Sequence, residues 1–269
     1  MTTLRKKGSL PELPAPAAIP WPPVPPPKSP APVRFPDPRG LGEEWVVGVT
    51  HAMSPHLVLE AYRKGIFPWP TSRSALIPWA SPEPRTNFPL AKLRDGSFSW
   101  PRSVRRDLKR AKAGWQVTFD QGYSAVMRAC AERPGEGTWI TLELYRTYCA
   151  LHALGWGHSV EVWQPLDGGG RELIGGLYGL AVGGLFAGES MFHRETGASK
   201  VAFASMAEHL VARGFTLFDV QAHSEHLGSL GCVDLPRADY LEALAKVVDA
   251  QVRFLPDQAA ANCFSTSRL

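Results

Sequence analysis

Apolar and charged residues recur along the chain either at helical spacing or in short apolar or alternating runs, and these two patterns predict a mixture of helices and strands. Spacings of three and four residues predict helices over 101–112, 123–132, 142–154 and 199–213. Short apolar or alternating runs predict strands over 117–119, 159–163, 173–180, 185–192 and 215–220. The order of these elements predicts an antiparallel meander that leads into a βαβ crossover, and therefore an α/β (α+β) fold.

The stretch before these elements begins as a helix and continues as a proline-rich loop. Ser54 followed by Pro55 is typical of a helix start, and Gly65 is typical of a helix end. Over 67–85 prolines are so frequent that we expect no regular strand ladder. The two tryptophans of this loop indicate a packed loop or the wall of a binding site.

Composition separates a tail from a globular body. Residues 1–40 hold thirteen of the 25 prolines, which favours a solvated, largely unfolded tail, with a proline-motif ligand as the alternative. The whole chain has 269 residues, of which 44% are apolar and 20% charged, as in soluble proteins with a substantial core. Its longest mainly apolar stretch without charge, 173–188, has 16 residues, and a membrane span needs about 20.

Metal and cofactor motifs are missing from the sequence. The four cysteines have no CxxC spacing, which argues against a zinc site or a disulfide framework and fits reduced thiols in the cytoplasm. Neither a dinucleotide-binding nor a P-loop motif is present. His223 and His226 would need further metal ligands that nearby sequence lacks, so polar or helix-capping roles are favoured. We therefore expect no metal and no cofactor.

The predicted helix over 101–112 carries six cations and one acid, in a chain whose net charge is only +4. One face of this helix follows the i, i+3, i+4, i+7 spacing and consists of Arg102, Arg105, Arg106 and Lys109, with Arg110 beside them. This pattern is compatible both with a solvated helix surface and with a face that contacts phosphates.

The loop Arg194–Ser199 joins a predicted strand to a predicted helix, where backbone N–H groups point toward an incoming anion. Its sequence nearly matches the R/QxxGxG/A loop with which acetyltransferases of the GNAT type hold the pyrophosphate of CoA. The last position is serine in place of glycine or alanine. An acyl-CoA site is therefore one interpretation of this loop.

Three polar residues interrupt apolar strands. Asp219 and Gln221 lie two residues apart at the end of the last predicted strand, so an extended backbone places both side chains on one face. They form either a strand end that emerges into solvent or a polar pair at the carboxyl end of a sheet, where sites of α/β proteins cluster. Glu189 needs a partner, which is a cationic substrate group or one of Arg194 and Lys200.

Nine segments along residues 40–245 form a wider pattern: Ala61–Trp69, Trp79–Arg85, Gly137–Thr141, His158–Trp163, Gly188–Phe192, Ala198–Lys200, Phe218–Gln221, His226–Gly231 and Pro236–Tyr240. In this order and spacing the chain resembles the leucyl/phenylalanyl-tRNA–protein transferase family. It departs from the family's pattern over 50–55, where Gly-Asp-Leu-Ser-Pro is common, and at Val220, where cysteine is frequent.

The resemblance implies an enzyme that transfers Leu, Phe or Met from aminoacyl-tRNA to proteins with N-terminal Arg or Lys and so marks them for N-end-rule degradation. It implies a small N-terminal domain over 41–98 and a GNAT-like catalytic domain over 99–250, flanked by the tail and by a C-terminal extension over 251–269. Because the acyl donor is an ester on RNA, CoA is not used, and the loop Arg194–Ser199 would serve the tRNA 3′ end. We expect a cytoplasmic monomer without a membrane partner.

The resemblance also assigns roles to single residues. It makes Asp219 and Gln221 the catalytic pair and Glu189 the acid that binds the basic N-terminal residue of the acceptor. The residues expected to bind the aminoacyl group and the terminal adenosine are Trp69, Trp139, Phe186, Leu210 and Ser224. The face expected to follow the tRNA acceptor stem consists of Arg102, Arg105, Arg106, Lys109 and Arg110.

An aminoacyl ester is already activated, so positioning a neutral α-amine is the main task of such an enzyme. We expect Gln221 to orient the amine and Asp219 either to fix Gln221 or to hold the positive charge of the substrate, and a general-base role for Asp219 stays open. Two other classes remain. A small-molecule GNAT acetyltransferase would bind acetyl-CoA tightly, and a non-catalytic RNA-binding module would explain the basic helix but neither Glu189 nor the polar pair.

Overall fold

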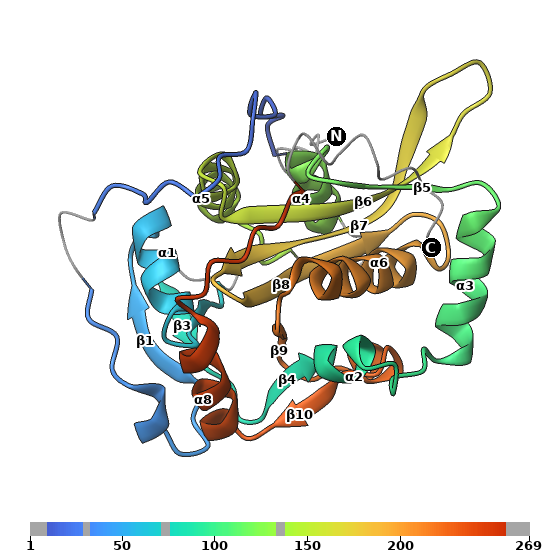
Figure 1. Cartoon of the computed structure of the whole chain (residues 1–269). Coiled ribbons are helices and arrows are strands. Elements are labelled where there is room, and N and C mark those ends of the chain that lie inside the picture. Colours follow the sequence, from blue (N-terminus) through green and yellow to red (C-terminus); the bar gives the residue numbers. More distant parts are fainter. Residues whose placement is uncertain (1–9, 29–32, 71–75, 133–137, 257–269) are drawn as a thin grey trace, which may run out of the picture.

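The computed structural model describes residues 10–28, 33–70, 76–132 and 138–256. The two ends of the chain, part of the loop over 67–85 and Gly137 lie outside these ranges, and so do the predictions made for them. A seven-stranded sheet forms the centre, with helices on both faces and a smaller three-stranded sheet at one side (Figure 1).

The strands are β1 (Val46–Thr50), β2 (Phe67–Pro68), β3 (Ile77–Ala80), β4 (Arg85–Phe88), β5 (Gln116–Phe119), β6 (Gly157–Pro165), β7 (Arg171–Val182), β8 (Leu185–His193), β9 (Leu217–Gln221) and β10 (Val233–Leu235). The helices are η1 (Pro38–Gly40), α1 (Pro55–Tyr62), α2 (Leu90–Arg94), α3 (Arg102–Lys112), α4 (Tyr123–Ala131), α5 (Leu142–Ala153), α6 (Ala198–Arg213), α7 (Glu225–Ser229) and α8 (Arg237–Val247).

The large sheet has the strand order β10-β4-β9-β8-β7-β6-β5. Strands β5 to β8 are antiparallel neighbours, and β8 continues through α6 into the parallel strand β9. The predicted meander, its hairpin and the βαβ crossover are therefore confirmed, and so is the α/β (α+β) class. Helices α4 and α5 pack on one face and α6 on the other, so β7 is buried beyond its first two residues (Figure 1).

Side-chain caps set the starts of several helices, and the one at Ser54 was predicted from the sequence. The Ser54 hydroxyl accepts a hydrogen bond from the backbone N–H of Leu57 at the start of α1. The Thr141 hydroxyl does the same for Leu144 at the start of α5. Gly65 follows α1 with φ +72°, and a Cβ there would lie 2.5 Å from a methyl of Leu241, so the close approach of α1 and α8 needs glycine.

The proline-rich loop over 67–85 forms strands, which the sequence analysis excluded. β3 is the central strand of the small sheet, with order β1-β3-β2, although Pro78 lies within it. The carbonyl of Pro78 still accepts a hydrogen bond from the N–H of Trp69 at 2.7 Å. In ladders this short, a proline can occupy a position whose missing donor costs little, so the argument from proline density was wrong here.

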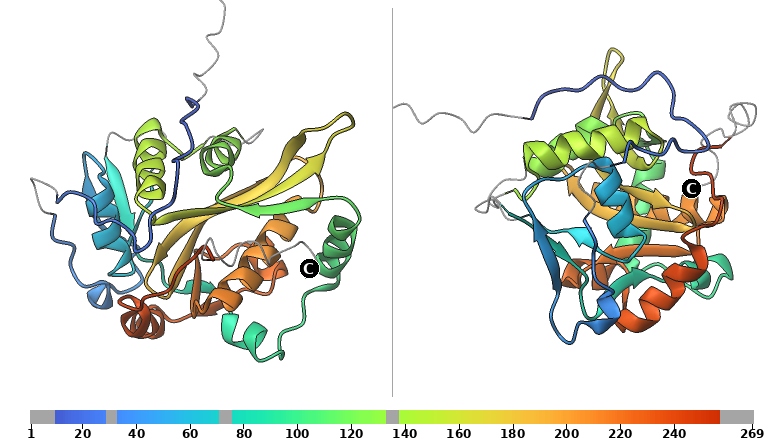
Figure 2. Two further views of the ribbon diagram at one scale, coloured as in Figure 1. Left: turned by 45° about the horizontal axis from the view of Figure 1, so that its top comes forward. Right: turned by 90° about the vertical axis from the view of Figure 1, so that its left-hand side faces the viewer.

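The described part of the predicted tail lies against the body of the protein rather than in solvent (Figure 2). The carbonyl of Pro11 accepts a hydrogen bond from the Tyr145 hydroxyl. The backbone N–H of Val24 donates to the carbonyl of Leu154, just after α5, and the carbonyl of Val24 accepts from the indole N–H of Trp156. The prediction of a largely unfolded tail is thus wrong for these residues. Prolines restrict the unfolded chain, which lowers the entropy cost of docking it.

The boundary predicted near residue 98 crosses one sheet. β4, which was expected in the N-terminal domain, pairs with β9 and β10 of the large sheet. The hydrophobic cluster on the α4 and α5 side also includes α1 and the small sheet. The segment after α8 returns to the body, where Phe254 is buried beside His209 of α6. The division into domains stays a prediction.

Candidate active site

A cavity of about 160 Å³ gathers the polar residues that interrupt the strands. It is lined by Pro68, Trp69, Pro70, Trp139, Glu189 and Gln221. Strand β2 and its continuation supply one wall, the segment before α5 supplies Trp139, and β8 and β9 supply the two polar side chains. Four of the predicted site residues are therefore brought together, although they are spread over 153 positions of the sequence (69 to 221).

Glu189 is the acid of this cavity, and three side chains donate hydrogen bonds to it. The Tyr62 hydroxyl lies 2.5 Å from Oε1, Gln221 Nε2 lies 3.1 Å from the same oxygen, and the Tyr148 hydroxyl lies 3.3 Å from Oε2. Burial, together with the nearby charge of Asp219, raises the pKa of Glu189 to about 7 despite these bonds. Arg194 and Lys200, which the sequence offered as alternative partners of Glu189, do not pair with it in the described residues.

Asp219 lies behind Gln221 and is fully buried. Its Oδ1 accepts hydrogen bonds from Arg85 Nε at 2.8 Å and from the backbone N–H of Gln221 at 2.8 Å. Its Oδ2 accepts from Arg85 Nη2 at 2.6 Å and from the Tyr240 hydroxyl at 3.0 Å. Both oxygens are thus engaged within the protein, which favours fixing Gln221 over holding the charge of a substrate.

Gln221 has φ +70°, an uncommon value for a residue other than glycine. This turn ends the extended geometry on which the expectation of a common face rested. The Asp219 side chain therefore reaches Arg85, while the Gln221 side chain reaches Glu189 in the cavity. The hydrogen bond from the Gln221 N–H to Asp219 holds the backbone in this conformation.

Arg85 completes the buried network and was not assigned a role from the sequence. Only 1% of it is exposed, and its guanidinium lies between the rings of Phe67 and Tyr240, at 4.6 and 4.5 Å from their centroids. It also donates from Nη1 to the carbonyl of Gly65. The residue lies in the matching segment Trp79–Arg85, which was its only sequence signal. Tyr62 and Tyr240 also lie in matching segments, whereas Tyr148 had no signal beyond its apolar spacing.

Three residues expected to bind substrate do not line the cavity. Phe186 precedes Glu189 by three residues on β8, so the two face opposite sides of the sheet, and Phe186 packs on Phe218 and Phe254. Leu210 is buried in the α6 cluster. Ser224 caps α7, because its hydroxyl accepts a hydrogen bond from the backbone N–H of Leu227.

Helix α3 presents the predicted basic face to solvent at one margin of the molecule (Figure 1). All five predicted cations are exposed. Arg106 pairs with Asp107, and Arg110 pairs with Glu195 at 2.7 Å. Within the described ranges the other three, Arg102, Arg105 and Lys109, form no ion pair. These charges are available to an anionic partner.

The N-terminus of α6 already faces a carboxylate. A Cβ built on Gly197, the residue before the helix, would lie 2.8 Å from the carboxyl carbon of the buried Asp107. The Lys200 ammonium lies 3.4 Å from the same carboxylate. Asp107 thus occupies the position where the loop Arg194–Ser199 was expected to receive an anion, which argues against a CoA pyrophosphate there.

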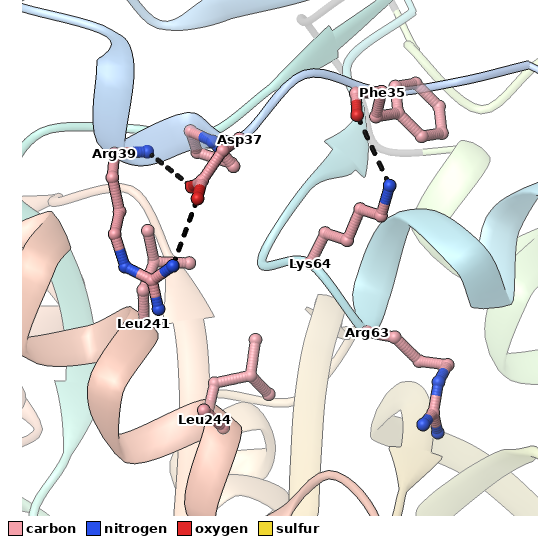
Figure 3. A pocket seen from close by; sticks show the side chains of 9 residues that line it. Phe35, Asp37, Arg39, Arg63, Lys64, Leu241 and Leu244 are labelled. Carbon is pink, nitrogen blue, oxygen red and sulfur yellow. Dashed lines mark hydrogen bonds and ion pairs between the residues drawn. The ribbon is translucent and has the colours of Figure 1, made fainter.

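A second, more open hollow of about 330 Å³ lies between η1, the end of α1 and α8. Figure 3 shows that Arg39 and Lys64, two of its cations, are directed to neighbours within the protein. Arg39 pairs with Asp37, and Lys64 donates to the carbonyl of Phe35. Arg63 pairs with Asp249. Since these charges are already partnered and Glu189 and Gln221 do not line it, the smaller cavity is the candidate site.

In the part of the chain that the structure describes, no group of three or more His, Cys, Asp or Glu side chains could hold a metal ion. None of the helices described there is long and apolar enough to cross a membrane.

Sequence comparisons with known proteins point to one family. The family model described as "Leucyl/phenylalanyl-tRNA protein transferase" matches residues 93–245, and the model of its N-terminal domain matches residues 52–83. A leucyl/phenylalanyl-tRNA--protein transferase of Syntrophotalea carbinolica is 43% identical over 79% of this chain and 86% of its own. Proteins of the same name from Cereibacter sphaeroides and Magnetococcus marinus are 44% and 39% identical, over 76% and 80% of this chain and 90% and 88% of theirs.

Proposed function

The chain belongs to the leucyl/phenylalanyl-tRNA–protein transferase family, and from this premise we propose that its cavity joins the aminoacyl group of tRNA to an N-terminal arginine or lysine. It is an aminoacyltransferase with aminoacyl-tRNA as donor and protein as acceptor. The observation that carries the finer proposal is Glu189, a carboxyl group at the wall of an aromatic cavity, hydrogen-bonded to Gln221.

Glu189 binds the side chain of the acceptor's first residue. An arginine guanidinium offers paired N–H donors that match a carboxylate, and a lysine ammonium offers a point charge. The carboxylate of Glu189 and the cationic side chain both lose hydration in the cavity. A buried charge of either kind is therefore favoured only when the other is present to pair with it. A neutral N-terminal side chain would leave the carboxylate unpaired, which explains a preference for basic acceptors.

Gln221 orients the α-amine of the same residue. Its amide N–H donates to Glu189, which leaves its amide oxygen to accept from the amine. The amine nitrogen attacks the ester carbonyl carbon, an amide bond forms, and the bond between that carbon and the tRNA ribose oxygen breaks. One amine proton ends on the ribose oxygen. Asp219 acts through Gln221, as a positioning residue that does not reach the amine.

The donor end of the cavity has apolar walls. Pro68, Trp69 and Trp139 offer surface to the aminoacyl side chain and to the terminal adenosine. Apolar pockets discriminate side chains that differ by one methylene by only about 1–3 kcal/mol. Acceptance of leucine together with phenylalanine and methionine follows from such a surface.

The test of this function is transfer of labelled leucine from leucyl-tRNA to a peptide that begins with arginine. We expect transfer to the arginine and lysine peptides and none to a matched glutamate peptide. The Gln221→Ala variant should lose turnover while its tRNA affinity stays unchanged. Tight binding of acetyl-CoA, or wild-type turnover in the variant, would reject the assignment.

The affinity for a cationic acceptor should depend on pH through Glu189. Burial raises the pKa of Glu189 to about 7, so below pH 7 the carboxyl group is mainly protonated and must lose a proton to bind a cation. We expect the inhibition constant of Nα-acetyl-argininamide to fall about tenfold per pH unit from pH 5 to 6.5 and to level off above pH 8. This ligand has no α-amine, so amine titration does not contribute. A flat profile contradicts the role of Glu189.

The basic face of α3 should set the salt dependence of tRNA binding. Replacing Arg105 and Arg106 by serine should reduce the slope of log Kd against log salt by roughly 1–2, because each phosphate contact releases about one counterion. The control variant Arg39→Ser/Lys246→Ser removes the same charge from η1 and α8 and should keep the slope. Filter binding of leucyl-tRNA from 50 to 300 mM salt measures both, and equal slopes in all proteins would exclude α3.

A further inference from the structure

Strand β1 is an edge strand whose outer side is open. It pairs only with β3, and no backbone group of the described residues bonds to its other edge. Its sequence, Val-Val-Gly-Val-Thr, is apolar, and Val46 and Val49 are 51% and 54% exposed. Proteins usually protect such edges with charges, prolines or a covering segment, because an open apolar edge accepts another chain. The open edge of β1 is therefore a candidate binding surface for another chain.

This edge continues the wall of the cavity. Trp45 immediately precedes β1, is 39% exposed, and contacts Trp69 edge to face with 6.3 Å between the ring centroids. Trp69 in turn lines the cavity with Glu189. The Trp45 indole N–H donates to the carbonyl of Glu83, which fixes the ring in this position. An apolar surface thus runs from the mouth of the cavity along β1.

The charges beside this surface have the opposite sign to those of α3. Glu43 and Glu44 are exposed next to Trp45 and form no ion pair among the residues that the structure describes. Helix α3, which carries those cations, lies at the opposite side of the molecule from β1, as Figure 1 and the left view of Figure 2 show. A polypeptide with a cationic start would be attracted to these two carboxylates.

We propose that Trp45 and the open edge of β1 dock the extended segment of the acceptor protein that follows its basic N-terminal residue. This inference rests on the proposed function, since it begins from an N-terminus held at Glu189. An N-terminal residue can enter the cavity only if the chain behind it is unfolded, and an extended chain can pair with an edge strand. Main-chain hydrogen bonds then supply affinity. The register shift between Val46 and Gly48 sets Val46 and Val49 opposite Ala80 and Pro78, on one face of the sheet, where alternate apolar side chains of the docked segment can meet them.

The consequence is that acceptor affinity grows with peptide length. The test compares an arginine-initiated dipeptide with an eight-residue peptide of apolar sequence, with leucyl-tRNA as donor. We expect the KM of the octapeptide to be about tenfold lower, from roughly three- to fivefold for each half-exposed valine that it covers. Every second N–H of the docked peptide faces β1. Of two octapeptides N-methylated at complementary sets of alternate peptide bonds, only the one that has lost the N–H groups facing β1 should therefore show a raised KM.

The variant Val46→Lys/Val49→Lys should abolish the advantage of length. Its KM for the octapeptide should rise to that of the dipeptide, while kcat, the dipeptide KM and the tRNA KM stay unchanged. The matched variant Val46→Thr/Val49→Thr keeps the strand and should lose only part of the advantage.

Three results would overturn the proposal. They are equal KM values for both peptide lengths in the wild-type protein, a raised tRNA KM in the lysine variant, and a wild-type dimer that the lysine variant dissociates in sedimentation. Failure of the dipeptide itself to accept leucine would instead contradict the proposed function, so the two failures are distinguishable.

Discussion

Replacing Arg85 by methionine should abolish measurable aminoacyl transfer and lower the free energy of unfolding by about 3–5 kcal/mol, the usual cost of removing one partner of a buried ion pair. The variant leaves the fully buried Asp219 without the two hydrogen bonds that Arg85 donates. With Asp219 no longer held by Arg85, the acceptor that fixes the Gln221 N–H loses its position. Urea unfolding and the leucyl-tRNA assay measure the two effects.

The double variant Arg85→Met/Asp219→Leu separates structure from function. Removing both charges of a buried pair is often neutral for stability, so unfolding free energy should largely return. Transfer should stay absent, because the Gln221 N–H has lost its acceptor and the φ +70° conformation its support. Wild-type stability in the single variant, or restored transfer in the double variant, contradicts the positioning role of Asp219 and Arg85.

Local chemistry made much of the fold predictable. The strands of the meander and the helix starts at Ser54 and Thr141 are governed by contacts a few residues apart, namely alternation and capping. The errors fell where partners distant in sequence decide. β4 exists because β9 and β10 lie beside it, and β3 tolerates Pro78 because its carbonyl still pairs.

The site was predictable to the extent that polar residues stand out in apolar strands. Glu189 and Gln221 do so, and the structure brings them within 3.1 Å. Phe186 was misplaced because its assignment came from the resemblance, while alternation along β8 already sets it opposite Glu189. Arg85 and Tyr62 were missed because their role depends on partners 134 and 127 residues away.

Keeping the buried Glu189 ionised lowers the free energy of unfolding. The pKa of Glu189 is about 7 in the folded protein and near 4.5 when exposed, so between these values the folded state binds more protons than the unfolded state. The free energy of unfolding therefore falls as pH rises from 4.5 to 7, by up to about 3 kcal/mol at 1.36 kcal/mol per pKa unit. The cationic acceptor offsets this cost when it binds.

Replacing Glu189 by glutamine should therefore separate acceptor binding from stability. The amide keeps an oxygen for Tyr62 and Gln221, and its NH2 group replaces the oxygen that faces the Tyr148 hydroxyl, which can accept from it. Because the amide has no proton to lose, Tm should exceed that of the wild type at pH 8 and match it at pH 5. The kcat/KM for an arginine peptide should fall about 10²- to 10³-fold, because a charged pair in the cavity is lost. Thermal unfolding at the two pH values and steady-state transfer measure the two effects.

Affinity for leucyl-tRNA serves as the control, since it rests on α3 and on the aromatic walls and should not change in the Glu189→Gln variant. A Tm lowered equally at both pH values would mean that Glu189 is a structural acceptor whose charge plays no part. An unchanged kcat/KM with a raised Tm would mean that the carboxylate is costly but does not contact the acceptor. Only the combination of a pH-dependent gain in Tm and a loss in kcat/KM fits a carboxylate kept for a cationic substrate.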